Sequence, residues 1–179
     1  MKKRDLALFL GMLCGDGHLS IHNKKRYLRR GLKTYQDYCT GFCNTDKRII
    51  EIFSELLYKI FNVKGNFYPR DRPNRKRIYE FNSYSRKVFD EIKDFGFPVG
   101  VKRDELRIPL FIKNGSKEDK INFLLGVFVT DGSLKNKAMF FHTGSKIFLE
   151  ELSFLIYELV GTKKKIKSYL QKEKYLSYQ

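Results

Sequence analysis

Two aspartates, Asp16 and Asp131, each follow a short apolar run and each precede a glycine. Apolar residues recur at helical spacing in both runs, which span residues 9–17 and 124–132. The glycine after each aspartate is a good stop signal for a helix, because glycine adopts the left-handed backbone conformation at little cost. The pattern therefore predicts two buried helices, each with one aspartate at its C-terminal end.

A carboxylate at a helix C-terminus is electrostatically unfavourable, because that end of the helix carries partial negative charge. The same placement in two apolar helices indicates a bound group that attracts negative charge. A divalent cation fits, since Mg²⁺ takes carboxylate ligands and the carbonyl oxygens at a helix end are further oxygen donors. We therefore predict a metal site at Asp16 and Asp131, with the backbone carbonyls of Gly15 and Thr130 as additional ligands. Mg²⁺ is the expected metal, and Mn²⁺ is expected to substitute for it.

Small residues recur at every fourth position in both runs. The two stripes are Ala7, Gly11 and Gly15 in the first run, and Asn122, Gly126 and Thr130 in the second. Small side chains let two helix backbones approach closely. The stripes therefore predict that the two helices pack together and that Asp16 and Asp131 lie side by side.

The two runs resemble the paired signature of the LAGLIDADG homing endonucleases, and the chain is similar to the monomeric, intron-encoded members with two motifs. The last aspartate of the motif falls on Asp16 and on Asp131, while its sixth position, often acidic, is Cys14 and Val129 here. The resemblance implies an α+β fold of two pseudo-symmetric αββαββ(α) halves. In it, the motif helices pack at the interface and antiparallel sheets form a DNA-binding saddle. It also implies metal-dependent phosphodiester hydrolysis that leaves a staggered double-strand break in a long, asymmetric target.

The second half of the chain repeats the first. Lys47, Glu51, Ser54 and Tyr58 match, at one constant offset, Lys146, Glu150, Ser153 and Tyr157. We expect a first half at 1–97, a linker at 98–119 and a second half at 120–179. The first half is expected to contain helices at 5–15, 49–61 and 85–95, and strand-forming segments at 18–21, 24–30, 34–39, 63–69 and 77–82. The second half is expected to contain strands at 138–143, 163–169 and 175–178 and a helix at 145–160, but no counterpart of the helix at 85–95. Thr45 or Asn44 is the expected N-cap of the helix at 49–61, and Ser116 is an expected N-cap with Asp119 in the capping-box position. In the family, a segment similar to residues 102–109 commonly leads into the second motif.

The chain is strongly basic. Its 179 residues carry 36 Lys and Arg against 20 Asp and Glu, a net charge of +16, which favours a polyanionic partner. No apolar run approaches the roughly 18–20 residues that span a bilayer, so we expect no membrane association. Asp5 follows the basic N-terminus and no small-residue cleavage site follows, which argues against a signal peptide. We expect a monomer inside the cell, in the cytoplasm or an organelle matrix.

Double-stranded DNA is the expected partner, with the chain's own intron RNA as a second one. No acidic residue separates Asp16 from Asp37, and aromatic residues alternate with cations there, as suits a strand lying in a groove. The family often places a Lys or Arg beside the scissile phosphates; Lys135, Lys137, Arg29 and Lys33 are candidates, and Lys135 is assigned as a third catalytic residue. The residues predicted to bind DNA are Arg26, Arg29, Arg30, Lys33, Tyr35, Arg70, Arg72, Arg75, Arg77, Lys135, Lys137, Lys164, Lys165 and Lys167.

Two other functions fit the same scaffold: an RNA-binding intron maturase and a nucleic-acid-binding protein that does not cleave. Either could lose one of the two aspartates, whereas this chain keeps both, although a dual-function protein would keep both as well. The endonuclease part of an intein is a third interpretation. The start at Met1 and the lack of a terminal His-Asn pair argue against it.

Overall fold

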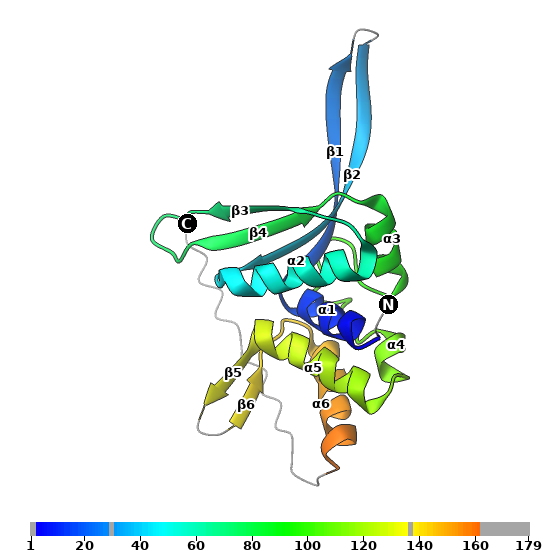
Figure 1. Cartoon of the computed structure of the whole chain (residues 1–179), viewed down its shortest axis with the longest axis vertical. Coiled ribbons are helices and arrows are strands. Elements are labelled where there is room, and N and C mark those ends of the chain that lie inside the picture. The colour runs from blue at the N-terminus through cyan, green and yellow to red at the C-terminus, as the bar shows by residue number, and fades with distance from the viewer. Residues whose placement is uncertain (1–2, 29–30, 136–137, 162–179) are drawn as a thin grey trace.

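The computed structural model describes residues 3–28, 31–135 and 138–161 (Figure 1). The first half contains α1 (Lys3–Asp16), β1 (Gly17–Leu28), β2 (Gly31–Asn44), α2 (Lys47–Phe61), β3 (Asn66–Arg70), β4 (Ile78–Ser83) and α3 (Arg86–Asp94). The remainder contains α4 (Leu110–Lys113), α5 (Lys117–Asp131), β5 (Gly132–Lys135), β6 (Ala138–Phe141) and α6 (Lys146–Val160). The predicted α+β class is confirmed.

Both sheets are antiparallel. The larger has the strand order β1-β2-β4-β3, and the smaller pairs β5 with β6. The sequence predicts three separate strand-forming segments between residues 17 and 44, whereas residues 17–28 and 31–44 form two long strands that pair along their whole length. The outer part of this β1–β2 hairpin projects well beyond the other strands (Figure 1), because β4 pairs with β2 only from Thr40 to Asn44. The strands predicted at 163–169 and 175–178 lie outside the described residues.

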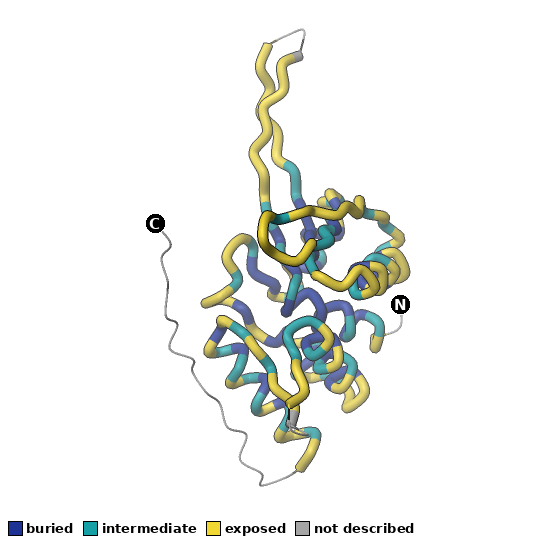
Figure 2. Tube along the Cα trace, turned by 90° about the vertical axis from the view of Figure 1, so that its left-hand side faces the viewer, coloured by how far each residue is buried: buried dark blue, intermediate teal, exposed yellow. Residues whose placement is uncertain are grey.

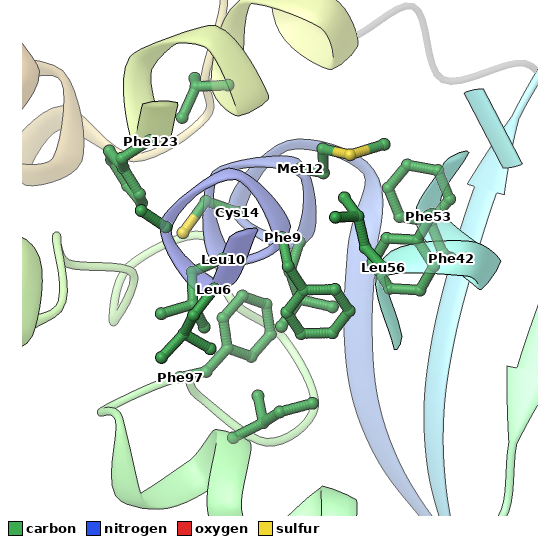
Figure 3. Close-up of a cluster of buried hydrophobic side chains, with 14 of the residues drawn as sticks. Leu6, Phe9, Leu10, Met12, Cys14, Phe42, Phe53, Leu56, Phe97 and Phe123 are labelled. Atoms are coloured by element: carbon green, nitrogen blue, oxygen red, sulfur yellow. The ribbon is translucent and has the colours of Figure 1, made fainter. Parts of the chain in front are cut away.

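The helix α1 lies at the centre of the molecule, between the layer formed by the sheet and α2 and the helix α5 (Figure 1). Its Phe9 ring stacks on Phe53 of α2 at a centroid distance of 4.8 Å, and Phe53 stacks on Phe42 of β2 at 4.2 Å. Figure 3 shows these rings together with Leu6 and Leu10 of the same helix. A helix that is apolar nearly all round is buried on most sides, as α1 is here.

The backbones of α1 and α5 touch where the small-residue stripes cross, as the sequence predicts. A Cβ atom added to Gly11 would lie 2.1 Å from the carbonyl oxygen of Phe123. One added to Gly126 would lie 2.3 Å from the carbonyl oxygen of Leu8. Both positions therefore exclude any side chain, and this contact fixes the separation of the two helices.

The glycines after the two aspartates do not end their helices in the left-handed conformation, so that prediction is wrong. Gly132 is extended, with φ −93° and ψ 157°, and Gly17 is not among the residues with positive φ. Their role is steric. A Cβ on Gly17 would lie 2.7 Å from the carbonyl oxygen of Leu13, and one on Gly132 would lie 2.3 Å from that of Phe128.

Side-chain caps begin both α2 and α5. Ser116 and Asp119 form the reciprocal capping box that the sequence predicts for the start of α5. The cap of α2 is Asp46, whose side chain accepts from the Arg48 amide at 2.9 Å, and not Asn44 or Thr45 as predicted. The side-chain amide of Asn44 instead donates to the Asp16 carboxylate. None of the helices in the described part of the chain is long and apolar enough to cross a membrane.

The Gly11 contact gives a direct test of the helix interface. Gly11→Ala should lower the free energy of unfolding by about 2 kcal/mol or more, because the new methyl group overlaps a backbone carbonyl that cannot rotate away. Urea unfolding measures this change. The control is Gly144→Ala, whose Cβ would have an Arg103 side-chain carbon as its nearest neighbour, at 3.3 Å, and no backbone atom among its three nearest. Similar stabilities for the two variants would contradict the close approach of α1 and α5.

Candidate active site

Asp16 and Asp131 lie at the adjoining C-terminal ends of α1 and α5. A Cβ added to Gly15 would lie 3.3 Å from Asp131 Oδ2 and would overlap the Thr130 hydroxyl. The Asp131 carboxylate is therefore packed against the residue that precedes Asp16. The structure thus brings the two predicted carboxylates together, each half-buried.

Both carboxylates are held in an environment that disfavours their charge. Burial is the main cause that raises the pKa of Asp16 to about 6, and the negative charge of Asp131 adds to it. Burial also raises the pKa of Asp131. Carboxylates with pKa values shifted by burial and by a neighbouring charge are concentrated at functional sites, because such an arrangement does not stabilise the fold. A bound cation would relieve the repulsion between the two groups.

Asn44, at the end of β2, is a site residue that the sequence did not reveal. Its side-chain amide donates to Asp16 Oδ2 at 2.6 Å, which favours the ionised carboxylate and partly offsets the rise in the Asp16 pKa. The Asn44 side-chain oxygen accepts from the Asp46 amide at 2.7 Å, so the start of α2 fixes the orientation of Asn44. The cap of one helix therefore positions a carboxylate at the end of another.

Lys102 is the second site residue that the sequence did not reveal. Its ammonium group donates to the carbonyl oxygens of Cys14 and Gly17, both at 2.9 Å, and also to that of Gly15. The positive charge thus lies at the negative end of α1, where it is favourable. It also opposes the rise in the pKa of both aspartates, while its own pKa is lowered by burial. The only sequence signal was the family segment 102–109, in which no side chain is distinguished by type or spacing.

Lys135, assigned from sequence as the third catalytic residue, is exposed at the end of β5. It lies four residues along the strand from Asp131, a span of about 13 Å at roughly 3.3 Å per residue. The charges that act on the Asp131 pKa come instead from Lys102 and His142. Lys102 is thus better placed than Lys135 to act on the carboxylates, and a catalytic role for Lys135 stays a prediction.

The residues predicted to bind DNA fall into three groups: exposed, paired or half-buried, and outside the described residues. Arg26, Lys33 and Tyr35 are exposed on the β1–β2 hairpin, and Arg75 and Lys135 are exposed at other loops and strand ends. Arg70 and Arg77 form ion pairs with Glu80 and Asp71, and Arg72 is half-buried. The remaining predicted contacts lie outside the described residues: Arg29, Arg30, Lys137, Lys164, Lys165 and Lys167.

The donors at the site are of the kind that a hard cation prefers. Two carboxylates and the carbonyl oxygens at two helix ends supply oxygen ligands only. Within the described residues no group of three or more His, Cys, Asp and Glu could hold a metal. A cation here would therefore keep water or substrate oxygens in its remaining positions, as Mg²⁺ commonly does. The Gly15 carbonyl, predicted as a ligand, accepts from Lys102, whereas Asp16 and Asp131 fit the role directly.

No protein-family model matches the chain. Among curated proteins, the ribonucleoside-diphosphate reductase NrdEB subunit alpha of Bacillus subtilis is 30% identical over 129 residues, which are 72% of this chain and 11% of that protein. The replication factor C small subunit of Methanocaldococcus jannaschii is 26% identical over 153 residues, 85% of this chain and 7% of that protein. The chain therefore spans only about a tenth of the length of these relatives.

Among solved structures, variants of the homing endonuclease I-DmoI match with a TM-score of 0.61 and 20% identity, covering 88% of this chain and 78% of that one. I-DmoI in complex with DNA and Mn matches with a TM-score of 0.59 and 19% identity, with the same coverage. The homing endonuclease I-WcaI bound to its DNA recognition sequence matches at 0.56 and 18%, covering 88% and 68%. The chain thus has the fold of the LAGLIDADG homing endonucleases.

The raised pKa of Asp16 predicts how stability depends on pH. The folded chain holds the Asp16 proton more tightly than the unfolded chain, so stability falls as the pH rises from the ordinary value of 3.8 towards about 6. Asp16→Asn removes the titrating carboxyl group and therefore also this loss of stability at higher pH. Without divalent cations, the variant should exceed the unaltered chain in stability by about 1–2 kcal/mol near neutral pH, allowing for partial exposure. The advantage should disappear at about pH 4.

Urea unfolding at the two pH values, in the presence of a chelator, measures the difference. Asp104→Asn removes an exposed aspartate and is the control; it should change stability little at either pH. A variant at Asp16 that is less stable than the unaltered chain at neutral pH would show that the carboxylate stabilises the fold instead.

Proposed function

We propose that this chain is a site-specific DNA endonuclease of the LAGLIDADG homing type, which cuts both strands by metal-dependent hydrolysis of phosphodiester bonds. The observation that carries the proposal is the meeting of Asp16 and Asp131 at the ends of two helices whose backbones touch. Both pKa values are raised, so the fold holds two carboxylates together at a cost to its stability. The neighbouring structures with this fold are homing endonucleases, some of them bound to DNA.

Divalent cations are the proposed cofactors. Structures of I-DmoI were obtained with DNA and Mn, with DNA and Ca, and with 2 mM Mg. In this chain Asp16 and Asp131 would hold the cations, with Mg²⁺ as the natural ion and Mn²⁺ as a substitute. A bound cation would make a water molecule nucleophilic and stabilise the leaving oxygen at the scissile phosphate.

The protein's own residues divide the remaining tasks. Asn44 holds Asp16 Oδ2 and so fixes the direction of that carboxylate. Lys102 brings a positive charge to the same helix end, where it would offset the charge that develops on a phosphate during cleavage. One carboxylate per helix suits one cut in each strand. The two cuts across the minor groove would then leave a staggered break.

The surrounding sheet and its charge favour duplex DNA as the substrate. A net charge of +16 supplies many cations for phosphate contacts, which position a protein on DNA without reading its sequence. Sequence would be read by the side chains on the open face of the four-stranded sheet, which is the face that α2 and α3 do not cover. Monomeric action follows if both carboxylates of one chain serve one target, and intron RNA remains a second proposed partner.

The curated relatives bear on whether such an endonuclease is an independent enzyme or part of a longer protein. The two curated relatives have different functions by name, and only a small part of each resembles this chain. Such a distribution suits an endonuclease module carried within other proteins as well as an intron-encoded enzyme.

Selection of cleaved molecules from a randomised double-stranded DNA library, in Mg²⁺, tests the function. The unaltered chain should enrich one long, asymmetric site. Asp16→Asn and Asp131→Asn should each lower double-strand cleavage at least about 100-fold while DNA binding persists, because cation binding is lost and the basic surface is unchanged. Asp104→Asn, an exposed substitution, should leave cleavage intact.

Equal DNA binding by all these proteins with no cleavage would reject the nuclease. It would leave the non-cleaving DNA-binding protein, and binding to RNA in place of DNA would favour the maturase. A nicked product from either aspartate variant would support the assignment of one carboxylate to each strand.

The role of Lys102 can be separated from DNA binding. Lys102→Met should lower the single-turnover cleavage rate about 10²–10³-fold, because a fixed positive charge beside both carboxylates is lost. The affinity for target DNA should change little. Lys135→Met, which removes an exposed lysine, should cleave nearly as fast as the unaltered chain. The opposite ranking would favour the sequence-based assignment of Lys135.

A further inference from the structure

The outer part of the β1–β2 hairpin is built differently from the rest of the sheet. It consists of residues 21–28 and 31–38, paired from Ile21 with Tyr38 to Leu28 with Gly31, and is called the arm below. No other strand of the described chain pairs with it, since β4 meets β2 only from Thr40 onward. Figure 1 shows the arm projecting from the body, and Figure 2 shows it exposed over most of its length.

The base of the arm is fixed to the body. Tyr38 packs edge-on against Phe89 of α3 at a centroid distance of 5.2 Å, and the Arg86 guanidinium lies over the Tyr38 ring at 4.8 Å. Lys24, which pairs with Asp37 within the arm at 2.5 Å, lies 5.5 Å from the centre of the Tyr84 ring in the body. These contacts set the direction of the arm relative to the carboxylates, so the arm is part of the scaffold.

The outer arm carries positive charge that it does not neutralise itself. Between Lys24 and Gln36 the sequence has no acidic residue, but it has five cations beyond Lys24: Lys25, Arg26, Arg29, Arg30 and Lys33. Arg26 and Lys33 lie directly opposite each other in the register, and both are exposed. Like charges at paired positions destabilise a hairpin. A polyanion against this surface would remove the penalty.

The strand period places three of these cations, Lys24, Arg26 and Lys33, on one face of the arm, and Lys25 on the other. Because alternate residues share a face, Lys24, Arg26, Lys33 and Tyr35 continue the face of the sheet opposite to that covered by α2 and α3. On the covered face, Tyr38 contacts α3 and Phe42 contacts α2. The cationic face of the arm is therefore a continuation of the open face proposed to meet DNA.

Among the described residues after Asp131, no hairpin is comparable in length to the arm. The β5–β6 hairpin pairs only from Gly132 with Phe141 to Lys135 with Ala138. That hairpin has four residues per strand, whereas the arm alone has eight residues per strand. Eight residues at about 3.3 Å each extend about 26 Å, which corresponds to about eight base pairs at 3.4 Å per pair.

We propose that the arm binds the phosphate backbone of duplex DNA that flanks the target on the Asp16 side, so that the footprint is longer on this side than on the Asp131 side. This inference rests on the proposed function for the identity of the polyanion. It adds an asymmetry to that function, because the arm extends the DNA contact on the Asp16 side only, by up to about eight base pairs.

Salt dependence of binding to a duplex of arbitrary sequence tests the arm without knowledge of the target. An arm-shortened variant replaces residues 25–34 by Asn-Gly, which suits a two-residue hairpin turn and keeps Lys24, Tyr35 and Asp37. It loses five cations. The slope of log K against log salt should therefore fall in magnitude by about 2–4, at about 0.9 for each lost phosphate contact.

A second variant distinguishes the effect of the arm's charge on DNA binding from the effect of its length. Arg26→Gln with Lys33→Gln leaves the hairpin intact and should reduce the slope by about 1–2. The control is Lys87→Gln with Lys93→Gln, two exposed lysines on α3, on the covered side of the sheet. It should leave the slope unchanged. Thermal unfolding should show that all these proteins remain folded.

Hydroxyl-radical footprinting on the selected target then tests whether the DNA footprint is longer on the Asp16 side. The arm-shortened variant should lose about four base pairs of protection at one end only, for the four residue pairs removed. Equal slopes and footprints for all proteins would overturn the arm inference while the DNA-binding function stands. Symmetric shortening would overturn it as well. Failure of the unaltered chain to bind DNA at all would overturn both.

Discussion

The contact between the backbones of α1 and α5 is the constraint on which the rest of the structure depends. With glycine at residues 11 and 126, each helix touches a carbonyl group of the other, so no side chain sets their spacing. This closeness brings Asp16 and Asp131 to one place and leaves α1 enclosed, with aromatic packing to α2 on one side and α5 on the other (Figure 3). The sheets on the two sides are consequently arranged about the carboxylates, because each sheet begins at the residue after an aspartate.

The electrostatics of this centre oppose folding and are only partly offset. Two carboxylates lie at helix ends that are themselves negative, and burial raises both of their pKa values. Lys102 and Asn44 supply the compensation, one with charge and the other with a single hydrogen bond. Both come from outside the two motif helices. The site is therefore assembled by the tertiary structure from four segments, although the motifs supply its most visible residues.

Local patterns predicted much of the fold. The helical period marked α2, the internal repeat marked α6, Ser116 with Asp119 marked the start of α5, and the small-residue stripes marked the helix interface. What failed depended on distant contacts. Lys102 reaches α1 from more than 80 positions away in the chain, and no composition or spacing distinguishes it from other lysines. The glycines at 17 and 132 follow helices as stop signals do, but space and not backbone conformation requires them. The polar outer part of β1 and β2 lacks the apolar alternation of a half-buried strand, so its continuity could not be read from pattern.

The arm also has consequences for solubility. Where it leaves the sheet, neither of its strands has a further neighbour in the described chain, so it presents two open edges of backbone donors and acceptors. Open edges pair readily with other chains, and natural proteins protect them with charged residues, lysine above all. The cations along the arm repel a second copy of the same arm. The same side chains that suit a polyanion thereby keep the strand edges of two free protein molecules from pairing. When a polyanion is bound to the arm, it neutralises that repulsion but itself covers the arm and blocks the pairing.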